Sequence, residues 1–162
     1  CCGTGNQLKL LKKMGFDNVT CVDLSEDMLS IARKGRYSPE CIHSDASDTG
    51  LPSDSIDLVM ISLALHEKKH QSASAILSEA YRILKPGSTI IVSDFNIGAD
   101  VRHFVRGAVT LIEFLAGGEH FQNYKEYVEN GGLTPLLDEC PFKLKTSNSA
   151  AMRAISVEEW VK

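Results

Sequence analysis

Short apolar runs that alternate with amphipathic segments are the feature that most constrains the fold of this chain. The runs Val19–Val22, Ile56–Ile61 and Thr89–Val92 are continuous and rich in β-branched residues, which is typical of buried strands. Apolar residues at helical spacing precede them in Asn6–Met14 and Ser72–Leu84. Such alternation predicts an α/β fold of the Rossmann-like, doubly wound kind, with a mostly parallel sheet and helices on both faces.

The second half of the chain changes pattern. A long helix is predicted over Asp100–Ala116, with an apolar stripe that we expect to pack into a core, and shorter helices follow before a closing antiparallel hairpin. We expect a single domain over residues 1–162, with a cofactor-binding half at 1–95 and substrate-side elements at 96–162. Since the chain opens on a turn of the kind that follows a strand, we expect the first strand of the sheet to be missing from it.

Composition excludes several classes of protein. The net charge of -4 gives no general attraction to nucleic acid, and no run approaches the ~20 apolar residues of a membrane span. The odd count of five cysteines, without a Cys-x-x-Cys pair, predicts reduced thiols in a cytoplasmic protein. No metal-ligand spacing is visible, so no metal site is predicted. A homodimer stays open.

A glycine turn and an acidic residue carry the strongest ligand signal. Gly3 and Gly5 permit a tight turn before a helix, whose amino end suits an anion. Asp23 follows the next strand, where a carboxylate can accept both hydroxyls of a ribose. A dinucleotide fingerprint would require a third glycine at the position of Leu8, so the pattern favours a nucleoside with a small anionic tail over NAD.

The turn Cys1-Cys2-Gly3-Thr4-Gly5 resembles motif I of class I S-adenosylmethionine-dependent methyltransferases. This variant looks like menaquinone and ubiquinone C-methyltransferases and their type 11 relatives, although Cys1 replaces the usual first glycine. The resemblance continues in order through the ribose segment Val22–Leu29, the adenine segment Ser44–Ala46, residues 51–59 around the fourth strand, and Ile83–Gly87 before the fifth.

The resemblance implies S-adenosylmethionine as the cofactor and methyl transfer to a small-molecule acceptor as the function. It implies that Asp23 binds the ribose, that Leu24 and Met28 pack on the adenine, and that Asp45 with Ala46 reads the adenine edge. The whole implied cofactor set is Cys2, Gly3, Thr4, Gly5, Asp23, Leu24, Met28, Asp45, Ala46, Ser62 and Leu63.

Methyl transfer from a sulfonium needs alignment and exclusion of water, and it needs a base only if the acceptor must lose a proton. His66, after the fourth strand, is the candidate base or substrate contact, and Asn96, His120 and Tyr124 are the other candidate substrate contacts. A catalytically silent domain that binds the cofactor or a protein partner would use the same residues. A nucleotide-dependent oxidoreductase is the third interpretation, and Leu8 counts against it.

Overall fold

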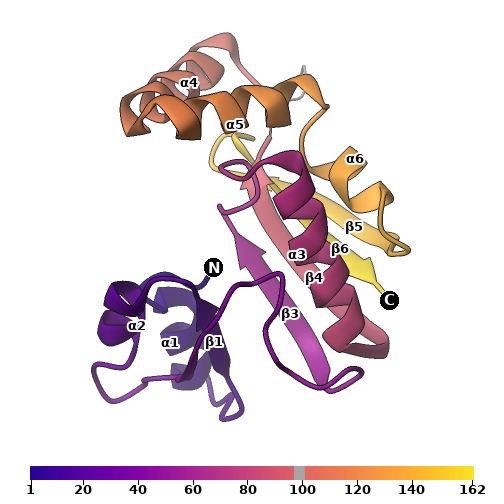
Figure 1. Cartoon of the computed structure of the whole chain (residues 1–162). Coiled ribbons are helices and arrows are strands. Elements are labelled where there is room, and N and C mark those ends of the chain that lie inside the picture. The colour runs from indigo at the N-terminus through magenta and orange to yellow at the C-terminus, as the bar shows by residue number, and fades with distance from the viewer. Residues whose placement is uncertain (97–100) are drawn as a thin grey trace. The chain divides into compact units, whose positions relative to one another are not determined.

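The computed structural model describes residues 1–96 and 101–162, and the chain forms two compact units, Cys1–Leu51 and Pro52–Lys162. The order of elements along the chain follows the predicted alternation of strands and helices up to β4 (Figure 1). The organisation as a single domain stays a prediction.

The first unit contains two helices and a two-stranded parallel sheet. Helix α1 (Asn6–Lys13) precedes β1 (Thr20–Asp23), and α2 (Glu26–Ala32) precedes β2 (Glu40–His43), which pairs in parallel with β1. Ser25 caps the amino end of helix α2, where its hydroxyl accepts a hydrogen bond from the Met28 N–H. The small core of this unit consists of Cys21, Leu29 and Ala32, and Cys2, Leu8 and Cys41 pack against it.

The prediction of five reduced cysteines is wrong for Cys2 and Cys21, whose sulfur atoms are joined as a disulfide. The turn folds Cys2 back over β1, which brings the two Cα atoms to 5.7 Å, a separation that suits a disulfide. Cys41, opposite Cys21 on the neighbouring strand, keeps its sulfur 3.3 Å from that of Cys21. Sequence spacing carries no sign of this contact, because the tertiary fold alone creates it.

The second unit is built on a four-stranded sheet of order β3-β4-β6-β5. Strand β3 (Ile56–Ser62) pairs in parallel with β4 (Leu84–Phe95), while β6 (Ile155–Val161) runs antiparallel to both β4 and β5 (Lys143–Ala150). The predicted α/β fold with parallel pairs and a C-terminal antiparallel hairpin is therefore confirmed. The turn of the hairpin lies at residues 151–153, which adopt positive φ angles.

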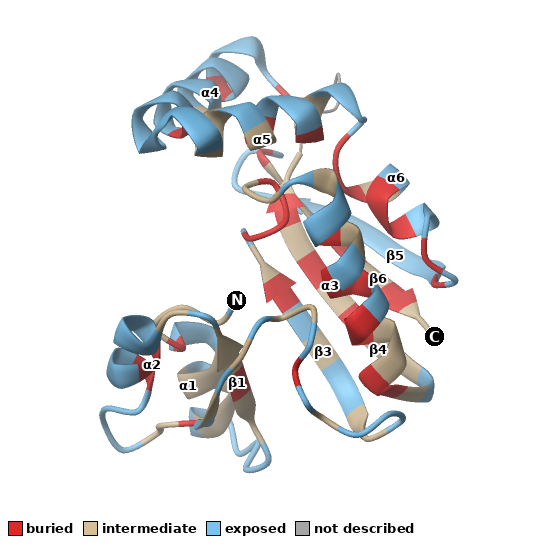
Figure 2. Ribbon diagram, in the orientation of Figure 1, coloured by how far each residue is buried: buried red, intermediate tan, exposed pale blue. Residues whose placement is uncertain are grey.

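Helices α3 (His70–Ile83) and α6 (Leu133–Asp138) pack together and lie over one face of this sheet, as Figure 1 shows. The buried apolar residues of α3 recur at helical spacing and include Ala73, Ile76 and Leu77, as predicted. On β4, alternate side chains from Ile90 through Val92 to Asp94 are buried, so this face of the strand ends in a buried carboxylate (Figure 2).

Helices α4 (His103–Ala116) and α5 (Gly118–Glu129) contact each other along the chain after β4. The predicted start of the long helix, Asp100, lies outside the described residues. Core packing of the apolar stripe is confirmed only at its beginning, where Val101 and Val105 are buried. It is wrong for the other large apolar residues of the stripe, which face solvent because α5 covers only part of α4; these are Phe104, Leu111, Ile112 and Leu115.

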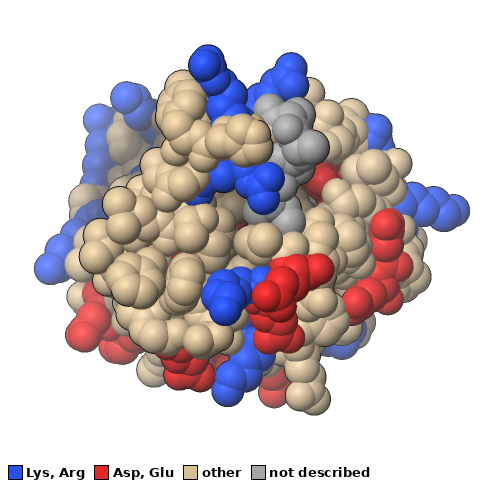
Figure 3. All heavy atoms as spheres, turned by 90° about the horizontal axis from the view of Figure 1, so that it is seen from above, with Lys and Arg blue, Asp and Glu red and all other residues tan. Residues whose placement is uncertain are grey.

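From the side of α4 and α5, most of the visible surface is uncharged, and a basic and an acidic group stand side by side near its middle, as Figure 3 shows. Within the part of the chain that the structure describes, no helix is both long and apolar enough to cross a membrane.

Candidate functional site

The glycine turn and Asp23 are in direct contact. Gly3 and Gly5 have φ angles of +53° and +71°, the left-handed conformation that glycine adopts without strain. The Gly3 N–H donates to Asp23 Oδ2 at 2.7 Å, and the Ser25 N–H donates to Asp23 Oδ1 at 3.0 Å. The carboxylate at the end of β1 is therefore held on both oxygens by backbone amides from two different loops.

The surroundings of Asp23 keep it ionised. Partial burial works against the charged form, but the backbone N–H groups of Ser25, Gly3 and Cys2 and the positive charge of the N-terminal amine together outweigh it, so the pKa of Asp23 lies below its ordinary value. The side chain is still 14% exposed, and each carboxylate oxygen can accept more than one hydrogen bond. Asp23 can thus accept further hydrogen bonds from a diol.

Apolar side chains beside Asp23 are left in solvent. Leu24 is 67% exposed and Met28 is 42% exposed, which leaves both side chains able to pack on a flat ligand. Asp45 follows β2, where its Oδ1 accepts both the N–H and the hydroxyl of Ser47 at 2.8 and 2.7 Å, so part of its bonding capacity holds the local turn that contains Ala46.

In the second unit, β3 leads into a buried loop. The Ser62 hydroxyl bonds to the Ser93 hydroxyl, and the Leu63 N–H donates to the Ser93 carbonyl at 2.8 Å. Leu63 has a φ of 48°, a strained conformation for a leucine, and its side chain is exposed. This bend turns the chain inward so that Leu65 and His66 become buried.

His66 is fixed by Asp94, the buried carboxylate at the end of β4. Its Nδ1 lies 2.6 Å from Asp94 Oδ1, which also accepts the Phe95 N–H, and Asp94 Oδ2 accepts the backbone N–H groups of Leu65 and His66. Burial disfavours the imidazolium, but the hydrogen bond to Asp94 and the charges of Asp94 and Glu113 outweigh it and raise the pKa of His66.

The free edge of the His66 ring faces a cluster of side chains from α4 and α5. Its Nε2 lies 3.7 Å from Glu113 Oε2, which bonds in turn to Nε2 of His120 at 2.7 Å. The ring centroid of Tyr124 is 6.5 Å from that of His66. The structure therefore brings together three of the predicted substrate contacts, His66, His120 and Tyr124.

Asn96, the fourth predicted substrate contact, lies elsewhere. It lines a separate polar hollow of about 430 Å³ with residues of β5 and β6, among them Asn148 and Ser156. The cause is the antiparallel pairing of β6 with β4, which turns the backbone of Asn96 toward Ala154, whose carbonyl accepts its N–H at 2.8 Å.

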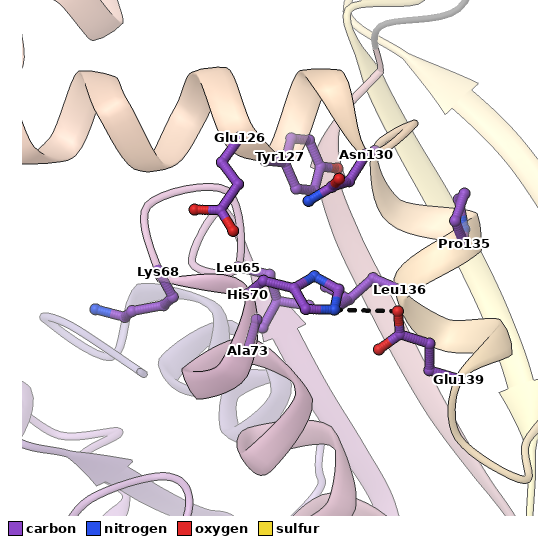
Figure 4. A pocket seen from close by; sticks show the side chains of 11 residues that line it. Leu65, Lys68, His70, Ala73, Glu126, Tyr127, Asn130, Pro135, Leu136 and Glu139 are labelled. Carbon is purple, nitrogen blue, oxygen red and sulfur yellow. Dashed lines mark ion pairs between the residues drawn. The ribbon is translucent and has the colours of Figure 1, made fainter.

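A pocket of about 280 Å³ opens between α3, α5 and α6 (Figure 4). Leu65, Tyr127 and Leu136 line it together with charged groups, and His70 forms an ion pair with Glu139 across it at 3.0 Å. None of the residues predicted for the cofactor or the acceptor lines this pocket.

Two important residues were not predicted as site residues. Asp94, at the end of β4, anchors His66 from within the core. Glu113 sits in an apolar helix, where its charge was the only signal, yet its side chain is 95% buried. A buried glutamate requires partners, which it finds in the two histidines.

Comparison with known proteins agrees with the motifs. A family model described as a methyltransferase domain matches residues 1–92, more than half of the chain. A demethylmenaquinone methyltransferase from Clavibacter sepedonicus is 35% identical over 97 residues, which are 58% of this chain and 38% of that protein. A demethylmenaquinone methyltransferase from Leptospira interrogans is 33% identical over 102 residues, which are 58% of this chain and 40% of that protein. The match thus spans about two fifths of these relatives.

Solved structures show the same fold. A protein from Pyrococcus horikoshii superposes with a TM-score of 0.74 at 19% identity, covering 99% of this chain and 79% of that one. A SAM-dependent methyltransferase from Methanosarcina mazei superposes with a TM-score of 0.70 at 20% identity, covering 99% of this chain and 89% of that one. At such identities the likeness establishes the fold alone.

Proposed function

Because the chain belongs to the methyltransferase-domain family, we propose that it transfers a methyl group from S-adenosylmethionine to a small-molecule acceptor. The family predicted from the motifs is confirmed, and S-adenosylmethionine is the cofactor of that family. The observation that carries the proposal is the ionised Asp23 carboxylate, held by the glycine turn at the end of β1.

The residues of the first unit suit the cofactor. Asp23 offers two carboxylate oxygens at one point, which is what a ribose diol requires. A Cβ built on Gly3 would meet no atom within 4 Å, so the backbone is open to a ligand on that side. Gly5 precedes α1, so no side chain caps the N–H groups at the amino end of this helix. The amino end of α1 therefore suits the carboxylate of the cofactor's methionine part.

The remaining predicted cofactor contacts complete this proposal. Leu24 and Met28 would pack on the adenine from their exposed positions, while Asp45 and Ala46 would meet its edge. Cys2 and Thr4 would contribute backbone from the turn, and Ser62 and Leu63 would contribute from the end of β3. These assignments rest on the family's motifs.

The bound cofactor supplies a methyl group already activated on a sulfonium, so the chain has mainly to align the acceptor and exclude water. The rings of Phe95, Tyr124 and Tyr127 around His66 form a largely buried, water-poor environment suited to that task. A cyclic, hydroquinone-like acceptor is the first class to test, since the curated relatives are named demethylmenaquinone methyltransferases. A cytoplasmic location, a homodimer and the lack of a nucleic-acid partner stay predictions.

Turnover tests the proposal directly. The purified chain is incubated with methyl-labelled S-adenosylmethionine and hydroquinones that carry a free ring position, and both labelled product and S-adenosylhomocysteine are measured. We expect the two products in equal amounts, and their loss in Asp23→Ala. Saturable cofactor binding without product from hydroquinones, phenols or amines would favour the silent cofactor-binding domain instead.

A further inference from the structure

Three metal-ligand side chains from three separate elements converge in the second unit. His66 follows β3, Glu113 lies on α4 and His120 lies on α5, and one ligand atom of each lies within 4.8 Å of the others. The side chains of His66 and Glu113 are 5% exposed and that of His120 is 27% exposed. The cluster is thus shielded on most sides and open at His120.

A supporting carboxylate orients the first of these ligands. The fully buried Asp94 bonds to Nδ1 of His66, and its other hydrogen bonds come from backbone N–H groups. This leaves Nε2 as the ring atom that faces Glu113, 3.7 Å away. A histidine that binds a metal through one ring nitrogen commonly has the other nitrogen bonded to a carboxylate in this way.

We propose that His66, Glu113 and His120 bind a divalent transition-metal ion of the zinc class. Donor atoms around one tetrahedral zinc ion lie roughly 3.3 Å apart, given ligand distances of about 2.0–2.1 Å. The separations of 3.7 and 2.7 Å from Glu113 Oε2 to the two histidine nitrogens bracket that value. Small side-chain rotations bring all three donors to the ion.

The donor set selects the class of ion. Imidazole nitrogens suit zinc, cobalt, nickel and copper, whereas calcium and magnesium require oxygen ligands. Three protein ligands leave a fourth position open, as in catalytic rather than structural zinc sites. In this arrangement His66 is a metal ligand and not a free base. The inference deepens the proposed function, since His66 and His120 are also the proposed acceptor contacts. Its failure is distinguishable from that of the proposed function, because metal binding depends on residues of the second unit and the ribose contact on Asp23 of the first.

Metal binding by the whole chain tests the inference without an activity assay. The protein is stripped with a chelator and titrated with Co²⁺, followed by Zn²⁺ in competition. We expect one saturable equivalent with visible bands of four- or five-coordinate Co²⁺ and no thiolate-to-cobalt charge-transfer band. The absence of saturable binding would overturn the proposal, and so would a thiolate band, since it would place the ion on the cysteines.

Matched variants assign the ligands. Glu113→Gln and His120→Ala are expected to weaken Co²⁺ binding at least ~10-fold, the scale on which even supporting residues of metal sites act. His103→Ala removes an exposed histidine from the same helix as Glu113 and should leave the affinity unchanged. Equal affinity in all three variants would contradict the proposal.

A measurement on the unaltered protein guards against variants that fail to fold. The ¹⁵N resonances of Nε2 in His66 and His120 should shift together as one equivalent of Zn²⁺ is added, while those of His103 stay in place. If neither ring responds, the cluster holds protons rather than a metal ion and the proposal is refuted.

Discussion

Replacing Asp94 by asparagine isolates the hydrogen bonds that fix His66. An amide has one acceptor oxygen and one donor nitrogen, so it cannot accept from all the groups around Asp94. If the new amide nitrogen faces Leu65, the backbone N–H groups of Leu65 and His66 both lose their acceptor. If it faces the His66 ring, the ring must change tautomer and only the Phe95 N–H is orphaned.

The second orientation costs less and sets the magnitude. One orphaned buried N–H costs about 1–3 kcal/mol, and exchanging a charged for a neutral hydrogen bond to His66 costs about 1 kcal/mol more. We therefore expect Asp94→Asn to lower the free energy of unfolding by about 2–4 kcal/mol. The proton moves from Nδ1 to Nε2 of His66, which also removes that nitrogen as a metal ligand.

Urea unfolding followed by the fluorescence of the single tryptophan, the buried Trp160, measures the change. The matched control is Asp57→Asn, because Asp57 is 81% exposed and its pair with Lys85 lies on the surface. That control should change stability by less than about 0.5 kcal/mol. Equal stability of the two variants, or an unchanged His66 tautomer in the ¹⁵N spectrum, would refute the reasoning.

Three further predictions follow from burial and backbone geometry. Because the pKa of Asp23 is lowered, S-adenosylhomocysteine binding should stay constant as pH falls toward about 4 and weaken only below that, as calorimetry at several pH values can measure. Gly5→Ala should lower the free energy of unfolding in urea by about 2–4 kcal/mol, since the new Cβ would lie 3.0 Å from the Cβ of Ala32 on α2. In Gly15→Ala the new Cβ would meet no atom within 4 Å, so only the strain of the left-handed backbone lowers the stability. Leu137→Ala should cost about 2–5 kcal/mol because this side chain is fully buried, and Leu115→Ala should cost less than about 0.5 kcal/mol.

Local signals predicted the elements well. The run Ile56–Ile61 became β3 (Ile56–Ser62), and the run Val19–Val22 became β1 (Thr20–Asp23). The cap of α2 by Ser25 is likewise a local feature, because capping depends on residues a few positions apart. The same locality holds for the glycine turn, where Gly3 and Gly5 adopt the left-handed angles that a tight turn requires.

Tertiary contacts account for what the sequence could not predict. Glu113 and His66 are 47 positions apart, so no motif spacing connects them, and a charge within an apolar helix is usually solvated. The disulfide between Cys2 and Cys21 depends on how the turn folds over β1. The stripe of α4 has the right period for a core helix, but periodicity alone does not tell whether a partner covers Leu111.

Calorimetric titration of the purified chain with S-adenosylhomocysteine, and separately with NAD, tests the central claim most directly. We predict saturable one-to-one binding of S-adenosylhomocysteine alone, weakened by about 1–3 kcal/mol in Asp23→Ala and unchanged in Asp17→Ala, which alters an exposed aspartate of the same unit. Binding of NAD alone, or equal affinity of the Asp23 variant for S-adenosylhomocysteine, would contradict the account.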